Sequence, residues 1–127
     1  HGKMKRDFTY IDDIVEGVVR VLDRAPQPDP SFDTATPAPA HSWAAYQVLN
    51  IGNHGPAGLL EYLDALEDAL GRKAERNYLP MQPGDVPATF ADTTLLTEWT
   101  GHKPGTPIQA GIRQFVDWYL AHHKAMA

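Results

Sequence analysis

Hydrophobic residues recur every three or four positions in four stretches of the chain, which predicts four amphipathic helices. The clearest stretch covers residues 56–71, where Pro56 suits the first turn and Gly71 suits the C-terminal end. Another helix is expected to begin near Asp13 and to end before Pro26. The remaining two are expected over residues 91–101 and 106–123.

Polar residues at the ends of these stretches predict where each helix is capped. Asp13 followed by Glu16 resembles a capping box. Asp92 and Gly101 suit the start and the end of the third helix, and Thr106 suits the start of the last one. The apolar spacing predicts that the last helix buries Ile108, Ile112, Phe115 and Tyr119.

Three shorter stretches are predicted as strands because they gather β-branched and aromatic residues: 8–10, 45–52 and 74–80. Residues 25–45 hold five of the chain's 11 prolines and are predicted as a long extended loop. About four helices with short strands make an α+β fold. We expect one domain over residues 1–127, since this length suffices for one modest core.

Composition and charge narrow the classes of function. The formal net charge is −5 and the basic residues are scattered, so no stripe indicates nucleic-acid binding. The chain has no cysteine, and its six histidines lack metal-ligand spacing, so no metal site is expected. No apolar run has the length of a membrane span. Neither a G-x-S-x-G nor a Tyr-x-x-x-Lys motif occurs, so we assign no catalytic residue.

Gly52, Gly55 and Gly58 stand three apart between a predicted strand and a predicted helix, which is the spacing of a dinucleotide-binding turn. Pro56 lies inside this turn and lacks an N–H group that a phosphate would use. The strand before it is also too polar for the centre of a parallel sheet, and too few strands follow. We therefore interpret the glycines as a strand-to-helix turn, with Gly58 incidental. A small NAD-binding protein built on this turn is an alternative.

Two further positions are candidates for ligand contacts. Arg6 follows a short basic stretch, and its fork of donors suits a phosphate; the alternative is a surface arginine paired with Asp7. Asp85 lies in a loop stiffened by prolines, where a carboxylate is able to accept hydrogen bonds from a ribose diol. The alternative for Asp85 is an Asx turn.

Three segments together resemble the C-terminal third of the extended short-chain dehydrogenase/reductase family of nucleotide-sugar epimerases and dehydratases. They read GKMKRDFTYIDDIVEGVVRVLDRAP, QVLNIGNHGPAGLLEYLDALEDALG and LPMQPGDVPATFADTTLLTEWTG. The Pro-rich loop and the segment MQPGDVPATFAD are most similar to the UDP-glucuronate 4-epimerase branch. The resemblance covers nearly the whole chain.

The resemblance implies a UDP-sugar-binding lobe that lacks its nucleotide-cofactor domain. In that family a Rossmann domain holds NAD, C4 of the sugar is transiently oxidised, and a Tyr-x-x-x-Lys pair does the acid–base work. All of these would lie upstream of residue 1, so this chain is expected to be inactive by itself and to bind no cofactor tightly. The parent enzyme is expected to be a cytoplasmic homodimer, and the exposed lobe to self-associate.

The resemblance also assigns substrate contacts to residues of this chain. Arg6 matches the family arginine at the UDP diphosphate, and Asp85 matches the acidic residue at the uridine ribose. Gln82 stands where related epimerases place a second arginine, so its role departs from the family pattern. Thr89 and Phe90 are expected at the sugar end. Asn50 and Asn53 are expected to satisfy backbone groups. For the whole chain, the alternatives are a non-catalytic nucleotide- or protein-binding module and another nucleotide-sugar epimerase or dehydratase of the same family.

Overall fold

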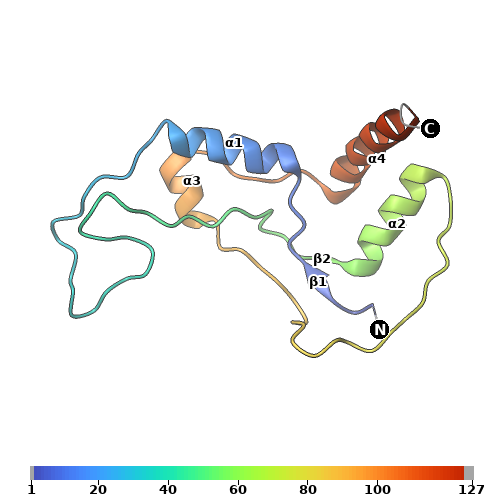
Figure 1. Ribbon diagram of the computed structural model, residues 1–127, viewed down its shortest axis with the longest axis horizontal. Helices are drawn as coiled ribbons and strands as arrows, with labels where there is room; N and C mark the ends of the chain where they lie inside the picture. The colour runs from blue at the N-terminus through green and yellow to red at the C-terminus, as the bar shows by residue number, and fades with distance from the viewer. Residues whose placement is uncertain (1, 125–127) are drawn as a thin grey trace.

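The computed structural model describes residues 2–124, and this part of the chain forms four helices and one two-stranded sheet (Figure 1). The helices α1 and α3 lie side by side, α2 packs against α4, and the sheet lies at the start of α2. The expected α+β class of four helices with short strands is thereby confirmed. The bounds are β1 Lys5–Arg6, α1 Ile11–Leu22, β2 Ala57–Gly58, α2 Leu59–Leu70, α3 Thr94–Thr100 and α4 Ile108–Lys124.

Strand β1 lies between two segments that are distant in sequence. It pairs antiparallel with β2, with Lys5 opposite Gly58. On its other side Lys5 forms a parallel bridge with Ala88. The Lys5 N–H donates to the Pro87 carbonyl at 2.9 Å, and the Lys5 carbonyl accepts from the Thr89 N–H at 3.2 Å. The start of the chain is therefore fixed by residues that come more than about fifty positions later.

The predicted helices are confirmed more closely at their C-terminal ends than at their starts. Gly71 and Gly101 end α2 and α3 in the left-handed conformation, with φ of 64° and 69°. Helix α2 begins at Leu59, because the two residues before it, Ala57 and Gly58, pair with β1 in the sheet. Pro56 therefore lies outside α2. The prediction that Pro56 occupies the first turn of this helix is wrong.

Asp13 does not cap the first helix. Helix α1 begins at Ile11, ahead of this residue. The Asp13 carboxylate instead accepts from the N–H groups of Gly105 at 3.2 Å and Thr106 at 2.9 Å. Burial by itself would raise the pKa of Asp13, but these hydrogen bonds lower it overall. The residue predicted as a local cap thus joins α1 to the segment before α4.

The starts of the last two helices also differ from the prediction. Thr93 is the residue directly before α3, although the Asp92 carboxylate accepts from the Thr94 N–H at 3.0 Å, so the predicted cap is one position early. Thr106 lies two positions before Ile108, the first residue of α4, and is not its cap residue. In both places the predicted helix start precedes the observed one.

None of the three predicted strands forms within residues 2–124. Phe8 stacks on Tyr62 of α2, with ring centroids 4.4 Å apart, so the 8–10 stretch packs against a helix. In the 45–52 stretch, Gln47 forms an isolated antiparallel β-bridge with His41. The 74–80 stretch is held to α2 by Arg76. A strand needs a ladder of hydrogen bonds to a neighbour as well as suitable residues, and apart from the Gln47–His41 bridge the described parts of these stretches form none.

The hydrophobic core is small and lies between the helices. Leu96, Ile112 and Val116 are its buried hydrophobic residues within the described part of the chain. Ile112 was predicted to be buried, and this is confirmed; Phe115 and Tyr119 were also predicted to be buried, but they are 46% and 40% exposed. The inner side of α4 is therefore set by Ile112 and Val116, which lie one helical turn apart.

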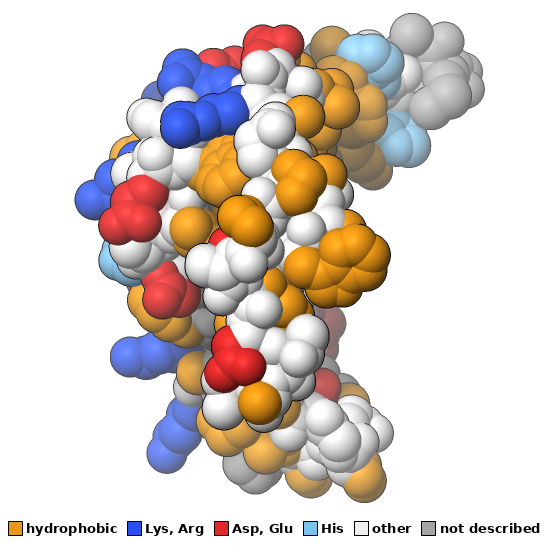
Figure 2. Space-filling view, turned by 90° about the vertical axis from the view of Figure 1, so that its left-hand side faces the viewer, with side chains coloured by type: hydrophobic (Ala, Val, Ile, Leu, Met, Phe, Trp, Pro, Cys, Tyr) orange, Lys and Arg blue, Asp and Glu red, His pale blue; other side chains and the backbone are white. Residues whose placement is uncertain are grey.

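Helix α1 carries an exposed apolar stripe. Its members recur every three or four residues, so they share one side of the helix, and Leu22 at the end is 76% exposed. Figure 2, which views the molecule from the left of Figure 1, shows hydrophobic side chains gathered over its middle and right, with Lys and Arg mainly at the left edge. We call Ile11, Val15, Val18 and Leu22 the α1 stripe.

The Pro-rich loop is anchored at its start by Arg24 and Trp99. The Trp99 indole N–H donates to the Arg24 carbonyl at 2.9 Å, and the Arg24 guanidinium lies 5.6 Å from the centroid of the Trp99 ring. Further along, His41 lies 3.5 Å from the Asp29 carboxylate. No regular helix or strand forms over 25–45, as predicted for this part of the described chain.

Candidate functional site

Arg6 is the last residue of β1, and among the described residues its positive charge is unpaired. Its guanidinium donates to the Lys5 carbonyl at 2.8 Å and lies 3.4 Å from the Met4 sulfur, and both partners are uncharged. Among the described residues, no carboxylate forms an ion pair with Arg6. The alternative of an Arg6–Asp7 pair is therefore wrong, and no described carboxylate neutralises the charge of Arg6.

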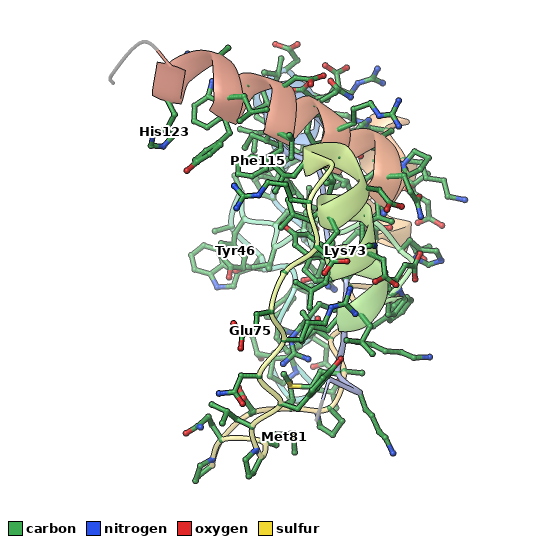
Figure 3. All side chains as sticks on the ribbon, turned by 90° about the vertical axis from the view of Figure 1, so that its right-hand side faces the viewer. Tyr46, Lys73, Glu75, Met81, Phe115 and His123 are labelled. Atoms are coloured by element: carbon green, nitrogen blue, oxygen red, sulfur yellow. The ribbon has the colours of Figure 1, made fainter. Side chains whose placement is uncertain are left out.

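An open hollow of about 400 Å³ lies next to Met4, the residue whose sulfur the Arg6 guanidinium contacts. Met4 lines it together with α2 and the segment that follows α2. Gln82 and Asp85 lie on its wall, which brings two of the predicted contacts together with a neighbour of Arg6. Figure 3 shows Met81, which also lines the hollow, at the end of the molecule remote from α4.

Asp85 is presented by a tight turn. Its N–H donates to the Gln82 carbonyl at 3.1 Å, and Gly84 adopts a φ of 91°. Proline at the second position and glycine with positive φ at the third are typical of a type II turn. The Asx-turn alternative for Asp85 is wrong, because the residue two positions later is Pro87, which has no N–H to donate.

Thr89 and Phe90 are not among the residues that line this hollow. The Thr89 hydroxyl oxygen accepts from the Asp7 N–H at 3.2 Å. The Phe90 ring is 58% exposed and lies 5.2 Å from the His54 ring, centroid to centroid. The structure therefore places Gln82 and Asp85 together on the wall of a hollow that Met4 also lines. It places Thr89 and Phe90 in a second group of residues around Asp7 and His54.

Asp7 makes contacts that the sequence does not predict, because the sequence alone suggests this residue only as a partner of Arg6. Its two carboxylate oxygens accept from the N–H groups of Asn53 at 3.0 Å and Ala91 at 3.1 Å. An added Cβ at Gly52 would lie 2.5 Å from the Asp7 oxygen and 2.5 Å from the Ala91 Cβ. The adjacency of Asp7 to a glycine-rich turn is visible only once the fold joins them.

The two asparagines of the NIGN segment bind backbone groups, as predicted. The Asn50 side-chain amide donates to the Asp92 carbonyl at 3.3 Å, and that of Asn53 donates to the Thr106 carbonyl at 3.3 Å. Both contacts fasten this segment to the parts of the chain around α3 and α4.

Glu67 of α2 holds the segment that leads to the hollow. This side chain is 5% exposed and accepts from Lys73 at 2.9 Å, from the Ala74 N–H at 3.1 Å and from Arg76. The contact with Lys73, followed by those with Ala74 and Arg76, lowers the pKa of Glu67 to about 2. Figure 3 shows Lys73 and Glu75 on this returning segment beside α2.

The lowered pKa of Glu67 predicts acid sensitivity. The ordinary pKa of a glutamate is 4.5, so between about pH 4.5 and pH 2 the carboxyl group of residue 67 is protonated in the unfolded chain but stays ionised in the folded one. The free energy of unfolding should therefore fall as the pH drops from about 4.5 to about 2. Urea unfolding midpoints measured across this range should decline less steeply in Glu67→Gln than in the unaltered chain. Exposed Glu61 provides a matched control, and an equal change of slope in Glu61→Gln would contradict the assignment.

No family model matches the chain. Protein CapI of Staphylococcus aureus is 47% identical over 98% of the chain and 37% of that protein. A probable UDP-glucuronate 4-epimerase of Rhizobium meliloti (strain 1021) is 42% identical over 97% of the chain and 36% of that protein. The chain is related to the UDP-glucuronate 4-epimerases. It spans about a third of the length of these two relatives.

Solved structures agree with this relationship. A UDP-glucuronic acid 4-epimerase Y149F mutant from Bacillus cereus, in complex with UDP-4-deoxy-4-fluoro-glucuronic acid and NAD, matches with a TM-score of 0.72 and 26% identity, over 95% of this chain and 33% of that one. UDP-glucose 4-epimerase from Bifidobacterium longum matches with a TM-score of 0.72 and 23% identity, over 94% of this chain and 31% of that one, which shows a shared fold. The resemblance drawn from the three sequence segments is confirmed.

Proposed function

We propose that the chain is the C-terminal, UDP-sugar-binding lobe of an NAD-dependent epimerase that interconverts UDP-glucuronate and UDP-galacturonate at C4. The observation that carries the proposal is the similarity of nearly the whole chain to UDP-glucuronate 4-epimerases. Because the chain spans about a third of the Rhizobium protein, the whole reaction belongs to a longer parent, and this lobe contributes substrate binding.

The unpaired charge of Arg6 supports a contact with the diphosphate. Its guanidinium has only uncharged partners among the described residues, and a guanidinium binds phosphate oxygens through charge-assisted hydrogen bonds. Asp85 on the wall of the hollow accepts from the ribose hydroxyls, and Gln82 donates to a phosphate oxygen without adding charge. Thr89 and Phe90, in the second group of residues, face the sugar.

The glycine turn does not fit the pyrophosphate of NAD. The Asn53 N–H is occupied by the Asp7 carboxylate, and the Leu59 N–H at the start of α2 donates to the Met4 carbonyl at 2.9 Å. Pro56 has no N–H, and a phosphate would also meet the negative charge of Asp7. Taking the hydride from C4 and returning it is the chemistry that NAD supplies, and its binding site is expected in another part of the parent.

A titration followed by NMR tests the proposal. Adding UDP-glucuronate to the ¹⁵N-labelled chain should shift the amide resonances of Arg6 and of residues 82–90 and leave those of α3 unchanged. The chain incubated with NAD and UDP-glucuronate should form no UDP-galacturonate, because it contributes binding alone. Turnover would contradict the assignment to a non-catalytic lobe, and the lack of any shift at millimolar ligand would contradict UDP-sugar binding.

The α1 stripe predicts self-association of the isolated chain. An apolar stripe of this kind is covered in a parent enzyme by another part of the protein, and in its absence a second copy provides the nearest apolar surface. Sedimentation velocity should show a concentration-dependent dimer or larger species, and Val18→Lys should reduce it. Thr34→Lys in the exposed loop adds the same charge elsewhere as a control. Equal effects of both variants, or a monomer at every concentration, would contradict the prediction.

A further inference from the structure

Asp7 connects three parts of the chain that are far apart in sequence. One carboxylate oxygen accepts from Asn53, 46 residues away, and the other accepts from Ala91, 84 residues away. The Asp7 N–H donates to the Thr89 hydroxyl, 82 residues away. Asp7 follows Arg6 directly, so the same short segment carries the arginine and the contacts that hold its surroundings. We call the contacts of Asp7 with Asn53, Thr89 and Ala91 the Asp7 clamp.

The clamp requires a close approach that only glycine permits. Gly52 is buried, and a Cβ at this position would come within 2.5 Å of both the Asp7 oxygen and the Ala91 Cβ. By contrast, an added Cβ at Gly55 would have its nearest neighbour at 3.8 Å, which is ordinary contact. The first glycine of the turn therefore makes room for a carboxylate that belongs to the protein itself.

The clamp also keeps Asp7 away from Arg6. Both oxygens of Asp7 are engaged by backbone N–H groups, so the carboxylate next in sequence does not neutralise the guanidinium. The same contacts hold residues 89–91 beside β1, where the Lys5 backbone adds two further hydrogen bonds to Pro87 and Thr89. The loop that carries Gln82 and Asp85 ends at this fixed point.

We propose that Asp7 is a positioning residue for the diphosphate of the UDP-sugar: it sets the loop 82–91 against β1 and leaves Arg6 free to bind phosphate. This inference rests on the proposed function. The positioning role and simple electrostatics predict opposite changes in UDP affinity when Asp7 is replaced. If Asp7 acted only as a nearby negative charge, its removal would strengthen the binding of an anion. If Asp7 is a positioning residue, its replacement should instead weaken UDP binding.

The test compares affinities for UDP and uridine in the 127-residue chain by NMR titration. Asp7→Asn keeps the shape but turns an N–H donor toward Asn53 or Ala91, so UDP affinity should fall about tenfold, whereas uridine affinity should change less. In an Arg6→Gln background the same substitution should weaken UDP binding by a smaller factor than in the unaltered chain, because the part of its effect that acts through Arg6 is already lost. Asp117→Asn on α4 is the matched control. Thr89→Val, which removes a single acceptor, is the milder variant if Asp7→Asn does not fold.

The outcomes separate the two proposals. Two results together support the positioning role. The first is a loss of UDP affinity in Asp7→Asn or Thr89→Val that is smaller when Arg6 is also replaced. The second is faster exchange of the Asn53 and Ala91 amides with solvent in Asp7→Asn. Unchanged or tighter UDP binding, or a loss that is the same with and without Arg6, overturns it while leaving the proposed function intact. If the unaltered chain binds no UDP, the proposed function fails, and the positioning role fails with it.

Discussion

Replacing Gly52 with alanine is expected to lower the free energy of unfolding by about 2–3 kcal/mol, because the new methyl group overpacks a closed site. Its Cβ would lie 2.5 Å from the Asp7 oxygen and 2.5 Å from the Ala91 Cβ. Both distances are too short for non-bonded atoms, so Asp7 and residue 91 must move away from the turn. Urea denaturation followed by circular dichroism measures the loss. Faster amide exchange at Asn53 and Ala91 would show that the damage is at the Asp7 clamp.

Gly55→Ala is the matched control for Gly52→Ala, since both glycines belong to the same turn. The nearest neighbour of a Cβ at Gly55 is the Asn53 carbonyl oxygen at 3.8 Å, so this substitution should change stability by no more than about 0.5 kcal/mol. Equal losses in the two variants would mean that the turn rejects any side chain, and would rule out a specific role for the approach of Asp7.

Arg6→Gln is expected to weaken UDP binding about ten- to a hundredfold, since a hydrogen bond from a charged donor to phosphate is lost. The variant should also show a smaller decrease of affinity with added salt, because the interaction removed is electrostatic. Stability should change little, as Arg6 contacts only the Lys5 carbonyl and the Met4 sulfur among the described residues. Calorimetric or NMR titration at two salt concentrations measures both effects.

Two substitutions control this experiment. Arg113→Gln removes the same charge from an exposed position of α4 and should leave UDP affinity unchanged. Arg6→Lys keeps the charge but loses the planar fork of donors, so it should lie between the original chain and Arg6→Gln. An affinity in Arg6→Gln equal to that of the original chain would remove Arg6 from the proposed diphosphate contact.

Local chemistry was sufficient to predict the helices. The leucine spacing of α2 and the glycines after α2 and α3 act within one or two turns, so Gly71 and Gly101 end their helices where expected. The same spacing could not tell which apolar residues of α4 are covered. Ile112 is buried but Phe115 is half exposed, because coverage depends on the neighbouring helix.

Non-local contacts explain what the sequence could not predict. Asp13 has the features of a cap for its own helix, yet its carboxylate binds Gly105 and Thr106, 92 and 93 residues later. The sequence suggests Asp7 only as a partner for its neighbour Arg6, because no local pattern pairs it with its distant backbone partners. For Asp85, one local fact was available: the proline two positions later cannot donate, which already excludes an Asx turn.

The placement of β1 has a consequence for the order in which the chain folds. Its partners in β2 and in residues 87–91 are synthesised well after it, at about 5–20 residues per second, so the emerging segment has nothing to pair with for several seconds. Contacts between such distant residues also form slowly because a long loop must close first. Arg6 therefore reaches its final position late, and a ribosome-bound chain that has not yet released residue 91 is expected to lack the contacts that hold Arg6 in place.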